Sequence, residues 1–339
     1  MSHPAPLPNV ALAMPAATAN RLFTARLLDA LADGVNLLSR EPLEDFSSAA
    51  ALAVLANTDI LITGWGCQQI DADVLDAAPR LRYILHAAGT VKNHVTEACW
   101  DRGIQVSTAA DANALPVAEY TLAMILLANK NILQLGQLVH SRHSPVSPEA
   151  EFPSMGNYRK RVGIIGASKI GRHVIRLLRP FDVDVVVADP FLDDAEATVL
   201  GTALVTLEEL ASTSDVVSLH APSLPSTLNL ISKEIIASFG PGTTFINTAR
   251  GELVDQDALL DRLQQGDLYA VLDVTTPWEL PPDSGFYTNP NVLLTPHIAG
   301  SLGTELERLA ATVVAEAHRV AKGEPLRHAL PAEQLSITA

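Results

Sequence analysis

The second half of the chain repeats one pattern, in which a short apolar run is followed by a longer stretch with helical spacing. Asp184–Ala188 is almost continuously apolar, which is typical of a strand covered on both faces. Strands that alternate with helices in this way build parallel sheets with helices on both sides. The predicted strands of this half are Val162–Ile165, Val183–Ala188, Val216–His220, Thr244–Asn247, Tyr269–Val274 and Val292–Thr295.

The first half shows the same alternation in a weaker form. A helix is predicted from about Asn20 to Asp33, ending at Gly34, because glycine commonly ends helices. The segment Asp111–Glu119 should contain the start of a second helix, with Pro116 in its first turn, and this helix should run to about Val139. The predicted strands are Asn9–Met14, Asp59–Thr63, Leu81–Leu85 and Ile104–Ser107.

The segment Ser141–Lys160 is rich in Ser, Pro and Glu and has no periodicity, so we expect a surface loop or arm between two domains. A last helix, from about Thr304 to Lys322, should return to the first domain. We therefore expect an α/β protein with two doubly wound parallel-sheet domains. The first would be discontinuous, with residues 1–115 and 305–339, and the second would comprise residues 116–304.

Composition limits the classes of function. The 339 residues carry a formal net charge of -15, which argues against a nucleic-acid partner because phosphates attract basic surfaces. No apolar run approaches the roughly 20 residues of a membrane span, and the first 15 residues lack the basic start of a signal peptide. Cys67 and Cys99 are expected to be free thiols. These features favour a cytoplasmic protein with no membrane partner.

The strand that ends at Ile165 leads into a degenerate dinucleotide-binding loop. Gly166, Ser168 and Gly171 follow the spacing of a phosphate-binding turn, with serine where the second glycine usually lies. Serine is small and its hydroxyl can donate to a phosphate oxygen. Asp189 follows the next strand, where an acid accepts hydrogen bonds from a ribose hydroxyl and repels a 2′-phosphate. This combination predicts NAD as the cofactor, with NADP less favoured.

Other chemistry-bearing residues also stand at the carboxyl ends of predicted strands, where ligands bind in open α/β sheets. Two such edges facing each other would form a cleft between the domains, with cofactor on one wall and substrate on the other. In the first half the strand ends are Gly64-Trp65 and Ala87–Thr90. In the second half they are Gly166, Asp189, Ala221-Pro222, Thr248-Ala249-Arg250, Asp273 and Pro296-His297.

Arg250, Glu279 and His297 supply the side-chain types that hydride transfer to a 2-keto acid needs. A guanidinium grips a carboxylate with two parallel hydrogen bonds and never deprotonates. An imidazole titrates near neutral pH, so it can donate or accept the proton, and an acid keeps it charged. The alternative for Arg250 is a structural ion pair with Asp255 or Asp273.

At these residues the chain resembles the D-isomer-specific 2-hydroxyacid dehydrogenase family, over about Asp59 to Leu326. The resemblance implies two Rossmann- and flavodoxin-like domains, a nicotinamide cofactor between them, a small 2-keto or 2-hydroxy acid substrate and a homodimer. It is carried by Leu81–Gly89, Arg102–Val106, Asn113–Glu119, Gly166–Gly171, Asn247–Asp255 and Asn291–His297.

Matched by position, the resemblance implies roles for individual residues. Arg250 would bind the substrate carboxylate and carbonyl, and His297 would be the general acid in reduction and the general base in oxidation. The backbone of Ala88, Gly89 and Thr90 would hold the substrate carboxylate. The cofactor-contact positions would be Gly166, Ser168, Lys169, Ile170, Asp189, Ala221, Pro222, Thr248, Ala249, Asp273, His297 and Gly300.

The chain departs from the family where the acidic partner of the histidine belongs. Counted from Asp273, Trp278 falls in the glutamate position and Glu279 in the following proline position, whereas counted from Arg250, Glu279 has the usual spacing. We expect Glu279 to be the acid, because a loop shifts by one residue more easily than a dyad loses its charge. If Trp278 occupies the position instead, His297 loses its partner and activity should fall or its pH profile should shift towards acid.

Other departures lie near the expected substrate. Lys92 stands where an acid is usual, and we interpret it as a solvated lysine. Trp65 would either narrow the substrate pocket or pack between the domains. The spacing of His86, His94 and His220 fits no zinc pattern, so no metal is expected.

Our first hypothesis is an NAD-dependent oxidoreductase that interconverts a 2-keto acid and a D-2-hydroxy acid, with glyoxylate and hydroxypyruvate as the first candidates. A short form of phosphoglycerate dehydrogenase is a further possibility, and formate dehydrogenase is less favoured because its pattern pairs glutamine with the histidine. The alternative from another class is an NAD(H)-binding sensor or corepressor-like module with little turnover.

Overall fold

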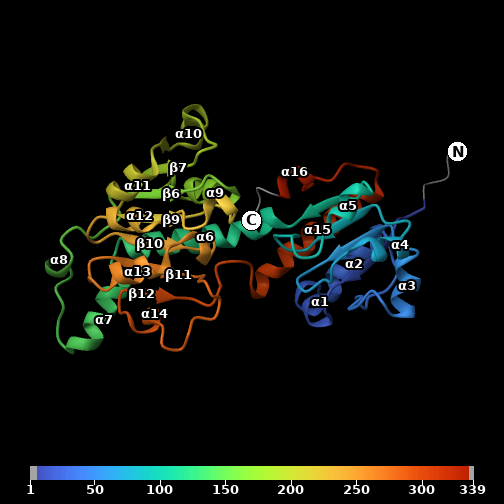
Figure 1. The fold of residues 1–339 in the computed structure, drawn as a ribbon, viewed down its shortest axis with the longest axis horizontal. Coiled ribbons are helices and arrows are strands. Elements are labelled where there is room, and N and C mark those ends of the chain that lie inside the picture. The colour runs from blue at the N-terminus through green and yellow to red at the C-terminus, as the bar shows by residue number, and fades with distance from the viewer. Residues whose placement is uncertain (1–5, 336–339) are drawn as a thin grey trace. The chain divides into compact units, whose positions relative to one another are not determined.

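The computed structural model describes residues 6–335, and the chain divides into two compact units. The first unit joins the described residues up to Asn113 to those from Ser301 onward, and the second is Ala114–Gly300. Each unit is built around its own sheet, in which every pair of neighbouring strands is parallel (Figure 1). The two Rossmann-like α/β domains expected from the sequence are therefore confirmed.

The sheet of the first unit has five strands in the order β2-β1-β3-β4-β5. Its strands are β1 (Asn9–Ala13), β2 (Asn36–Leu37), β3 (Ile60–Thr63), β4 (Tyr83–His86) and β5 (Gln105–Thr108). Its helices are α1 (Ala16–Leu22), α2 (Ala25–Gly34), α3 (Ala49–Leu55), α4 (Ala72–Ala77), α5 (Glu97–Asp101), η3 (Gly303–Glu305), α15 (Leu306–Ala321) and α16 (Ala332–Leu335).

The sheet of the second unit has seven strands in the order β12-β11-β10-β9-β6-β7-β8. Its strands are β6 (Arg161–Ile165), β7 (Asp184–Ala188), β8 (Ala203–Leu204), β9 (Val216–Leu219), β10 (Thr244–Asn247), β11 (Tyr269–Leu272) and β12 (Val292–Leu294). The helix α6 (Ala110–Ala128) leads into it. The other helices are α7 (Ile132–Arg142), α8 (Pro148–Glu151), α9 (Lys169–Leu178), α10 (Asp194–Leu200), α11 (Leu207–Thr213), η1 (Pro225–Thr227), α12 (Lys233–Ser238), η2 (Gly251–Leu253), α13 (Gln256–Leu263) and α14 (Gly285–Thr288).

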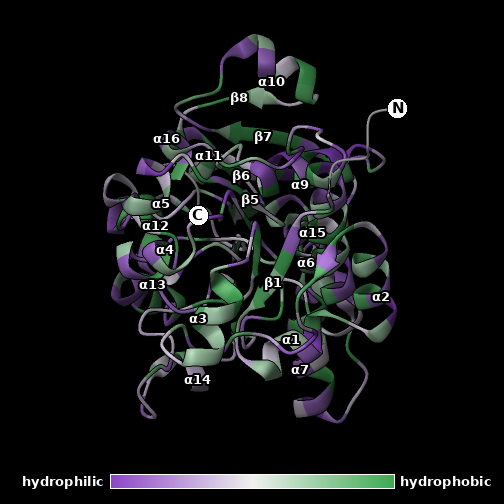
Figure 2. Cartoon of the chain, turned by 90° about the vertical axis from the view of Figure 1, so that its right-hand side faces the viewer, coloured by the Kyte–Doolittle hydropathy of each residue, from purple (hydrophilic) through white to green (hydrophobic). Residues whose placement is uncertain are grey.

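Both faces of the seven-stranded sheet are buried. Consecutive residues of one strand enter different cores: Val187 of β7 joins the cluster that contains α6 and α9, while Val186 joins the cluster on the opposite face. Because side chains alternate across a strand, a sheet covered on both sides requires continuous apolar strands. Strand β7 accordingly appears mostly green, for hydrophobic, in Figure 2. This explains the continuous apolar run Asp184–Ala188.

The last long helix completes the core of the first unit. Leu309, Ala310, Val313 and Ala317 of α15 are fully buried, and they lie in the same cluster as residues of β1. Helix α15 and strand β1, which are far apart in the sequence, therefore form parts of the same core.

One predicted helix is two. The expected helix Asn20–Asp33 is broken into α1 and α2, because Thr24 is extended and its side chain accepts a hydrogen bond from Leu27 N at 3.3 Å. A threonine cap of this kind begins a new helix and satisfies one of its free N–H groups.

The helix that was expected to have Pro116 in its first turn and to run to about Val139 is also two helices, α6 and α7. It breaks at Asn131, which has a left-handed φ of 47°. Pro116 lies inside α6 rather than in its first turn, because the helix already begins at Ala110. The expected loop Ser141–Lys160 contains the end of α7 and the short helix α8.

Among residues 6–335, no single helix is long and apolar enough to cross a membrane. Helices α6 and α7, which meet at an angle of 54°, reach the length and apolar composition of a membrane span only when the two are taken together.

Candidate functional site

The phosphate loop lies between β6 and α9. Gly166 has a φ of +94°, which a residue with a side chain rarely adopts, and a Cβ there would meet Ala221 N at 2.7 Å. A Cβ on Gly171 would meet Gly166 O at 2.0 Å. The loop therefore folds tightly onto the end of β9 and onto the first turn of α9, and only glycine fits at these two positions.

Serine at the second glycine position has a structural reason. Ser168 is the N-cap of α9, and its Oγ accepts a hydrogen bond from Gly171 N at 3.3 Å. The hydroxyl hydrogen remains available to donate, and the first N–H groups of a helix lack partners within it. These features fit the pyrophosphate of a dinucleotide, which helix N-termini of this type bind.

Asp189 lies at the end of β7, beside the same loop. One carboxylate oxygen accepts a hydrogen bond from Ala167 N at 2.6 Å, and the other accepts one from Phe191 N at 2.8 Å. The acid thus holds the phosphate loop against β7. Each oxygen keeps a lone pair for a ribose hydroxyl, so both functions are compatible.

The loop lies at the point where the strand order reverses. Strand β6 has β7 on one side and β9 on the other, and Ala221-Pro222 follows β9. Ligands of doubly wound sheets bind outside the carboxyl ends of the strands at such a switch point. Of the predicted cofactor residues, Ala221, Thr248 and Ala249 are buried, whereas Lys169 is exposed.

Arg250 follows β10 in a turn that Asn247 shapes. Asn247 Oδ1 accepts a hydrogen bond from Ala249 N, and its amide nitrogen donates to Arg250 O, both at 2.9 Å. A Cβ on Gly251 would meet Thr275 C at 2.2 Å, so this turn packs against the backbone after β11. The turn fixes where the arginine leaves the sheet.

The guanidinium of Arg250 is partly buried, and its only hydrogen bond within residues 6–335 runs from Nη1 to Ala249 O at 2.7 Å. No carboxylate pairs with it in this range. Asp255 instead caps α13 through a hydrogen bond from Ala258 N, and Asp273 is used elsewhere. Neither Asp255 nor Asp273 forms an ion pair with Arg250 among residues 6–335.

Asp273, at the end of β11, organises the histidine turn. Its buried carboxylate accepts hydrogen bonds from Thr295 Oγ1 at 2.6 Å, Ile298 N at 2.8 Å and Ala299 N at 2.9 Å. His297 N donates to Asp273 O at 3.1 Å. This network holds His297 at a left-handed φ of 55°, and Asp273 has a clear structural function beside its predicted contact with cofactor.

The ring of Trp278 lies against the imidazole of His297. The two ring centroids are 4.8 Å apart, with an angle of 49° between the ring planes. Glu279 is exposed, and within the described chain it makes no hydrogen bond or ion pair with His297. The pairing of Glu279 with the histidine stays a prediction, while the neighbouring tryptophan makes a direct contact.

The surroundings of His297 act in opposite directions on its proton. Partial burial lowers the pKa of His297, the Asp273 carboxylate raises it, and the positive charge of Arg250 lowers it, with the net result below the ordinary value. Tyr120 reaches the same turn from α6 through its hydroxyl, 2.9 Å from Thr295 Oγ1. At neutral pH the arrangement favours the neutral imidazole.

In the first unit, the predicted substrate loop follows β4. Ala88 is fully buried, Gly89 and Thr90 are half-buried, and the N–H groups of these three residues have no hydrogen-bond partner among residues 6–335. Such a set of adjacent free N–H groups can bind a carboxylate. Trp65 and Lys92 are exposed.

A buried cluster of polar side chains at the ends of β3 and β4 was not predicted from the sequence. Thr63 Oγ1 is 2.9 Å from His86 Nδ1 and 3.1 Å from His94 Nε2, and the two imidazole centroids are 4.5 Å apart. Burial lowers the pKa of His86 to about 3, with His94 adding to the effect, and burial lowers the pKa of His94 to about 4. The parallel register of β3 and β4 places Thr63 beside His86. The alignment of these two predicted strands in the sequence could have indicated this pair.

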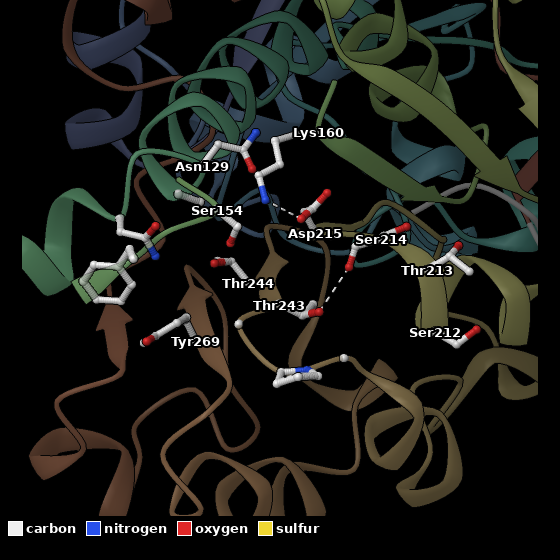
Figure 3. A pocket seen from close by; sticks show the side chains of 16 residues that line it. Asn129, Ser154, Lys160, Ser212, Thr213, Ser214, Asp215, Thr243, Thr244 and Tyr269 are labelled. Atoms are coloured by element: carbon white, nitrogen blue, oxygen red, sulfur yellow. Dashed lines mark hydrogen bonds and ion pairs between the residues drawn. The ribbon is translucent and has the colours of Figure 1, made fainter. Parts of the chain in front are cut away.

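A polar cavity of about 240 Å³ lies at the opposite edge of the seven-stranded sheet (Figure 3). Its lining includes Lys160 and Asp215, which form an ion pair at 2.5 Å, and Thr244 and Tyr269, where β10 and β11 begin. It is therefore separate from the candidate site at the carboxyl ends of the strands.

Residues of the second unit match a known protein family. Residues 122–299, more than half of the chain, match the family model described as "D-isomer specific 2-hydroxyacid dehydrogenase, NAD binding domain". The D-3-phosphoglycerate dehydrogenase of Mycobacterium leprae is 33% identical over 273 residues, covering 80% of this chain and 50% of the relative. The chain thus spans about half the length of the curated relatives it matches.

Two solved structures illustrate the likeness in three dimensions. The TT0316 protein from Thermus thermophilus is 28% identical with a TM-score of 0.73, and the match covers 95% of this chain and 100% of that one. A D-isomer specific 2-hydroxyacid dehydrogenase from Lactobacillus delbrueckii, solved as its NAD complex, has a TM-score of 0.79 at 20% identity, over 95% and 100% of the two chains, and shows the fold alone.

The prediction of NAD as the cofactor is confirmed by the family model, and the phosphate loop at residues 166–171 lies inside the matched range. The chain belongs to the D-isomer specific 2-hydroxyacid dehydrogenase family, and residues 122–299 are its NAD-binding domain.

Proposed function

We propose that the protein is an NAD-dependent oxidoreductase that interconverts a small 2-keto acid and the corresponding D-2-hydroxy acid. The observation that carries this proposal is the partly buried guanidinium of Arg250, which has no carboxylate partner among residues 6–335 and lies close enough to His297 to lower its pKa. A half-buried cation without a counter-ion favours an anionic ligand, because burial of an unpaired charge is costly.

In this proposal Arg250 binds the substrate carboxylate and carbonyl oxygen, and the free N–H groups of Ala88, Gly89 and Thr90 bind the carboxylate as well. When bound, the nicotinamide supplies or accepts a hydride at substrate C2. In reduction, His297 transfers its proton to the carbonyl oxygen, which gives the hydroxy acid and a neutral imidazole. In oxidation, the neutral imidazole takes the hydroxyl proton, so atoms and charges balance in both directions.

Ser168, the first turn of α9 and Asp189 are proposed to hold the cofactor. The N-cap geometry supports pyrophosphate binding, and the carboxylate of Asp189 supports a preference for NAD over NADP because it would repel a 2′-phosphate. Ile170, Ala221, Pro222, Thr248, Ala249 and Gly300 complete the proposed contact set. Lys169 belongs to it as well.

Glyoxylate and hydroxypyruvate are the first substrates to test. The matched relatives are named D-3-phosphoglycerate dehydrogenase, so the phosphorylated counterpart of hydroxypyruvate belongs in the same panel. The assay follows the absorbance of NADH with each 2-keto acid. Arg250→Gln and His297→Gln serve as variants, and His140→Gln, which changes an exposed histidine of α7, serves as the control.

We expect turnover of at least one 2-keto acid by the unchanged protein and by the control. Losing the bidentate carboxylate contact in Arg250→Gln should lower kcat/KM by about 100-fold or more, since a charge-assisted hydrogen-bonded pair is worth roughly 3 kcal/mol. NADH binding without turnover of any acid in the panel would contradict the proposal and favour an NAD(H)-sensing module.

We further propose a cytoplasmic homodimer. Four exposed apolar side chains on α6 and α7, namely Leu127, Ile132, Leu133 and Val139, support a second copy as the partner, and α7 has no buried residue of its own. The two free cysteines support a reducing compartment. Sedimentation should give twice the chain mass, and Ile132→Glu should shift the protein towards the monomer.

A further inference from the structure

The loop that contains Thr275–Trp278, after β11, brings an aromatic ring into contact with the imidazole of the proposed general acid and base. Trp278 contacts the His297 ring at a centroid distance of 4.8 Å, although more than half of its surface is exposed. Thr275 Oγ1 donates to the backbone oxygens of Pro277 at 3.0 Å and Trp278 at 3.2 Å. These hydrogen bonds therefore hold the loop that carries Trp278 next to His297.

The loop is also tied to the arginine turn. The backbone of Thr275 and Thr276 packs on Gly251, and Gln256 bonds Thr276 through both ends of its side-chain amide. Displacing Trp278 would require these contacts to move. A direct exchange of Trp278 for Glu279 beside the imidazole is consequently not a simple side-chain rotation.

Each charged or titratable group near His297 can be placed. Asp273 is at the end of β11 with its carboxylate occupied by three donors, Arg250 is at the end of β10, and Tyr120 of α6 bonds Thr295. Glu279 makes no hydrogen bond or ion pair with the imidazole within the described residues. No carboxylate bonds either ring nitrogen of His297 in that range.

We propose that Trp278 is a positioning residue for His297. Its ring takes the place beside the imidazole that an acidic partner would otherwise take, and it holds the imidazole in position. The inference rests on the proposed function of His297. Because no carboxylate among the described residues bonds the imidazole, burial and then Arg250 keep the pKa of His297 below its ordinary value despite Asp273, and the neutral ring is ready as the base for oxidation of the hydroxy acid. Reduction needs the protonated ring, and its rate should fall as pH rises above the pKa of His297.

The test replaces the tryptophan in three ways and uses NMR titration of the His297 imidazole, assigned with a His297→Gln sample. Trp278→Glu should raise the pKa of His297 by about 1 or more, because an adjacent carboxylate stabilises the imidazolium. Trp278→Phe should keep the original value, since it keeps an aromatic contact. Trp278→Leu should lose the ring contact and lower kcat more than it raises KM.

Tyr287→Leu is the matched control, because Tyr287 is as exposed as Trp278 and has no ring contact with His297 among residues 6–335. It should change neither the pKa of His297 nor kcat. The pH profile of kcat for reduction should move towards higher pH in Trp278→Glu and stay in place in Trp278→Phe.

An unchanged pKa of His297 in Trp278→Glu would overturn the inference, as would a Trp278→Leu variant with full kcat. The titration needs no substrate, so it separates the two proposals. A protein that reduces no 2-keto acid, yet shows the rise in Trp278→Glu, would refute the proposed function and support the ring contact. A protein that turns over substrate, but whose His297 pKa does not rise in Trp278→Glu, would support the proposed function and refute the ring contact.

Discussion

The buried pair His86 and His94 should make the stability of the protein depend steeply on pH. Both imidazoles are neutral in the fold, with pKa values lowered by burial to about 3 and about 4, from an ordinary value of 6.5. In the unfolded chain each ring takes up a proton below pH 6.5, which the folded protein does not match until pH falls to about 4. Stability is therefore complete above pH 6.5 and is lost as pH falls below it.

The magnitude follows from the pH interval. Between pH 6.5 and pH 5, each histidine costs about 2 kcal/mol, at roughly 1.4 kcal/mol per pH unit, so the pair costs about 4 kcal/mol. The assay is urea unfolding at pH 7 and pH 5. The double variant His86→Gln/His94→Gln should lose about 4 kcal/mol of this pH dependence, whereas His140→Gln should keep all of it.

A pH dependence equal in the double variant and the unchanged protein would refute this reasoning. NMR provides a second test that does not depend on the variant folding. The resonances of both buried rings should stay at their neutral positions from pH 7 to pH 5, and titration of either ring near pH 6.5 would contradict the burial argument.

Two further substitutions test the site in the second unit. Gly171→Ala would place a Cβ 2.0 Å from Gly166 O, so it should weaken NADH binding by about 10-fold or more, given that overpacking costs roughly 1–3 kcal/mol; equal affinity in fluorescence titration would contradict the close approach. Asp273→Asn removes the charge that holds the N–H groups of Ile298 and Ala299 and should cost about 2 kcal/mol in urea unfolding. A variant as stable as the parent would show that the turn does not depend on this carboxylate.

The alternation of apolar runs was sufficient to predict both parallel sheets except their edge strands β2 and β8, which are only two residues long. Burial on both faces requires continuous apolar strands, and this local signal placed β10 at Thr244–Asn247, as observed. Residues at strand ends were also predictable, because parallel strands bring their carboxyl ends to one edge. Gly166, Asp189, Arg250 and His297 all lie at that edge of one sheet.

Contacts between distant segments were not predictable in the same way. Helix breaks at Thr24 and Asn131 depend on single caps and a left-handed residue, which periodicity does not resolve. Counting along the sequence gave two positions for the acid, because spacing does not report how a loop packs. The ring contact between Trp278 and His297 becomes visible only when the loop after β11 is folded against the turn after β12.

The central claim is that this protein transfers a hydride between nicotinamide and C2 of a 2-keto acid. The most direct measurement uses NADH carrying deuterium at C4 of the nicotinamide and analyses the hydroxy acid by mass spectrometry and chiral chromatography. The account predicts deuterium at C2 and the D-enantiomer as the product. NADH that binds the protein but leaves no label in any product of the 2-keto acid panel would contradict it.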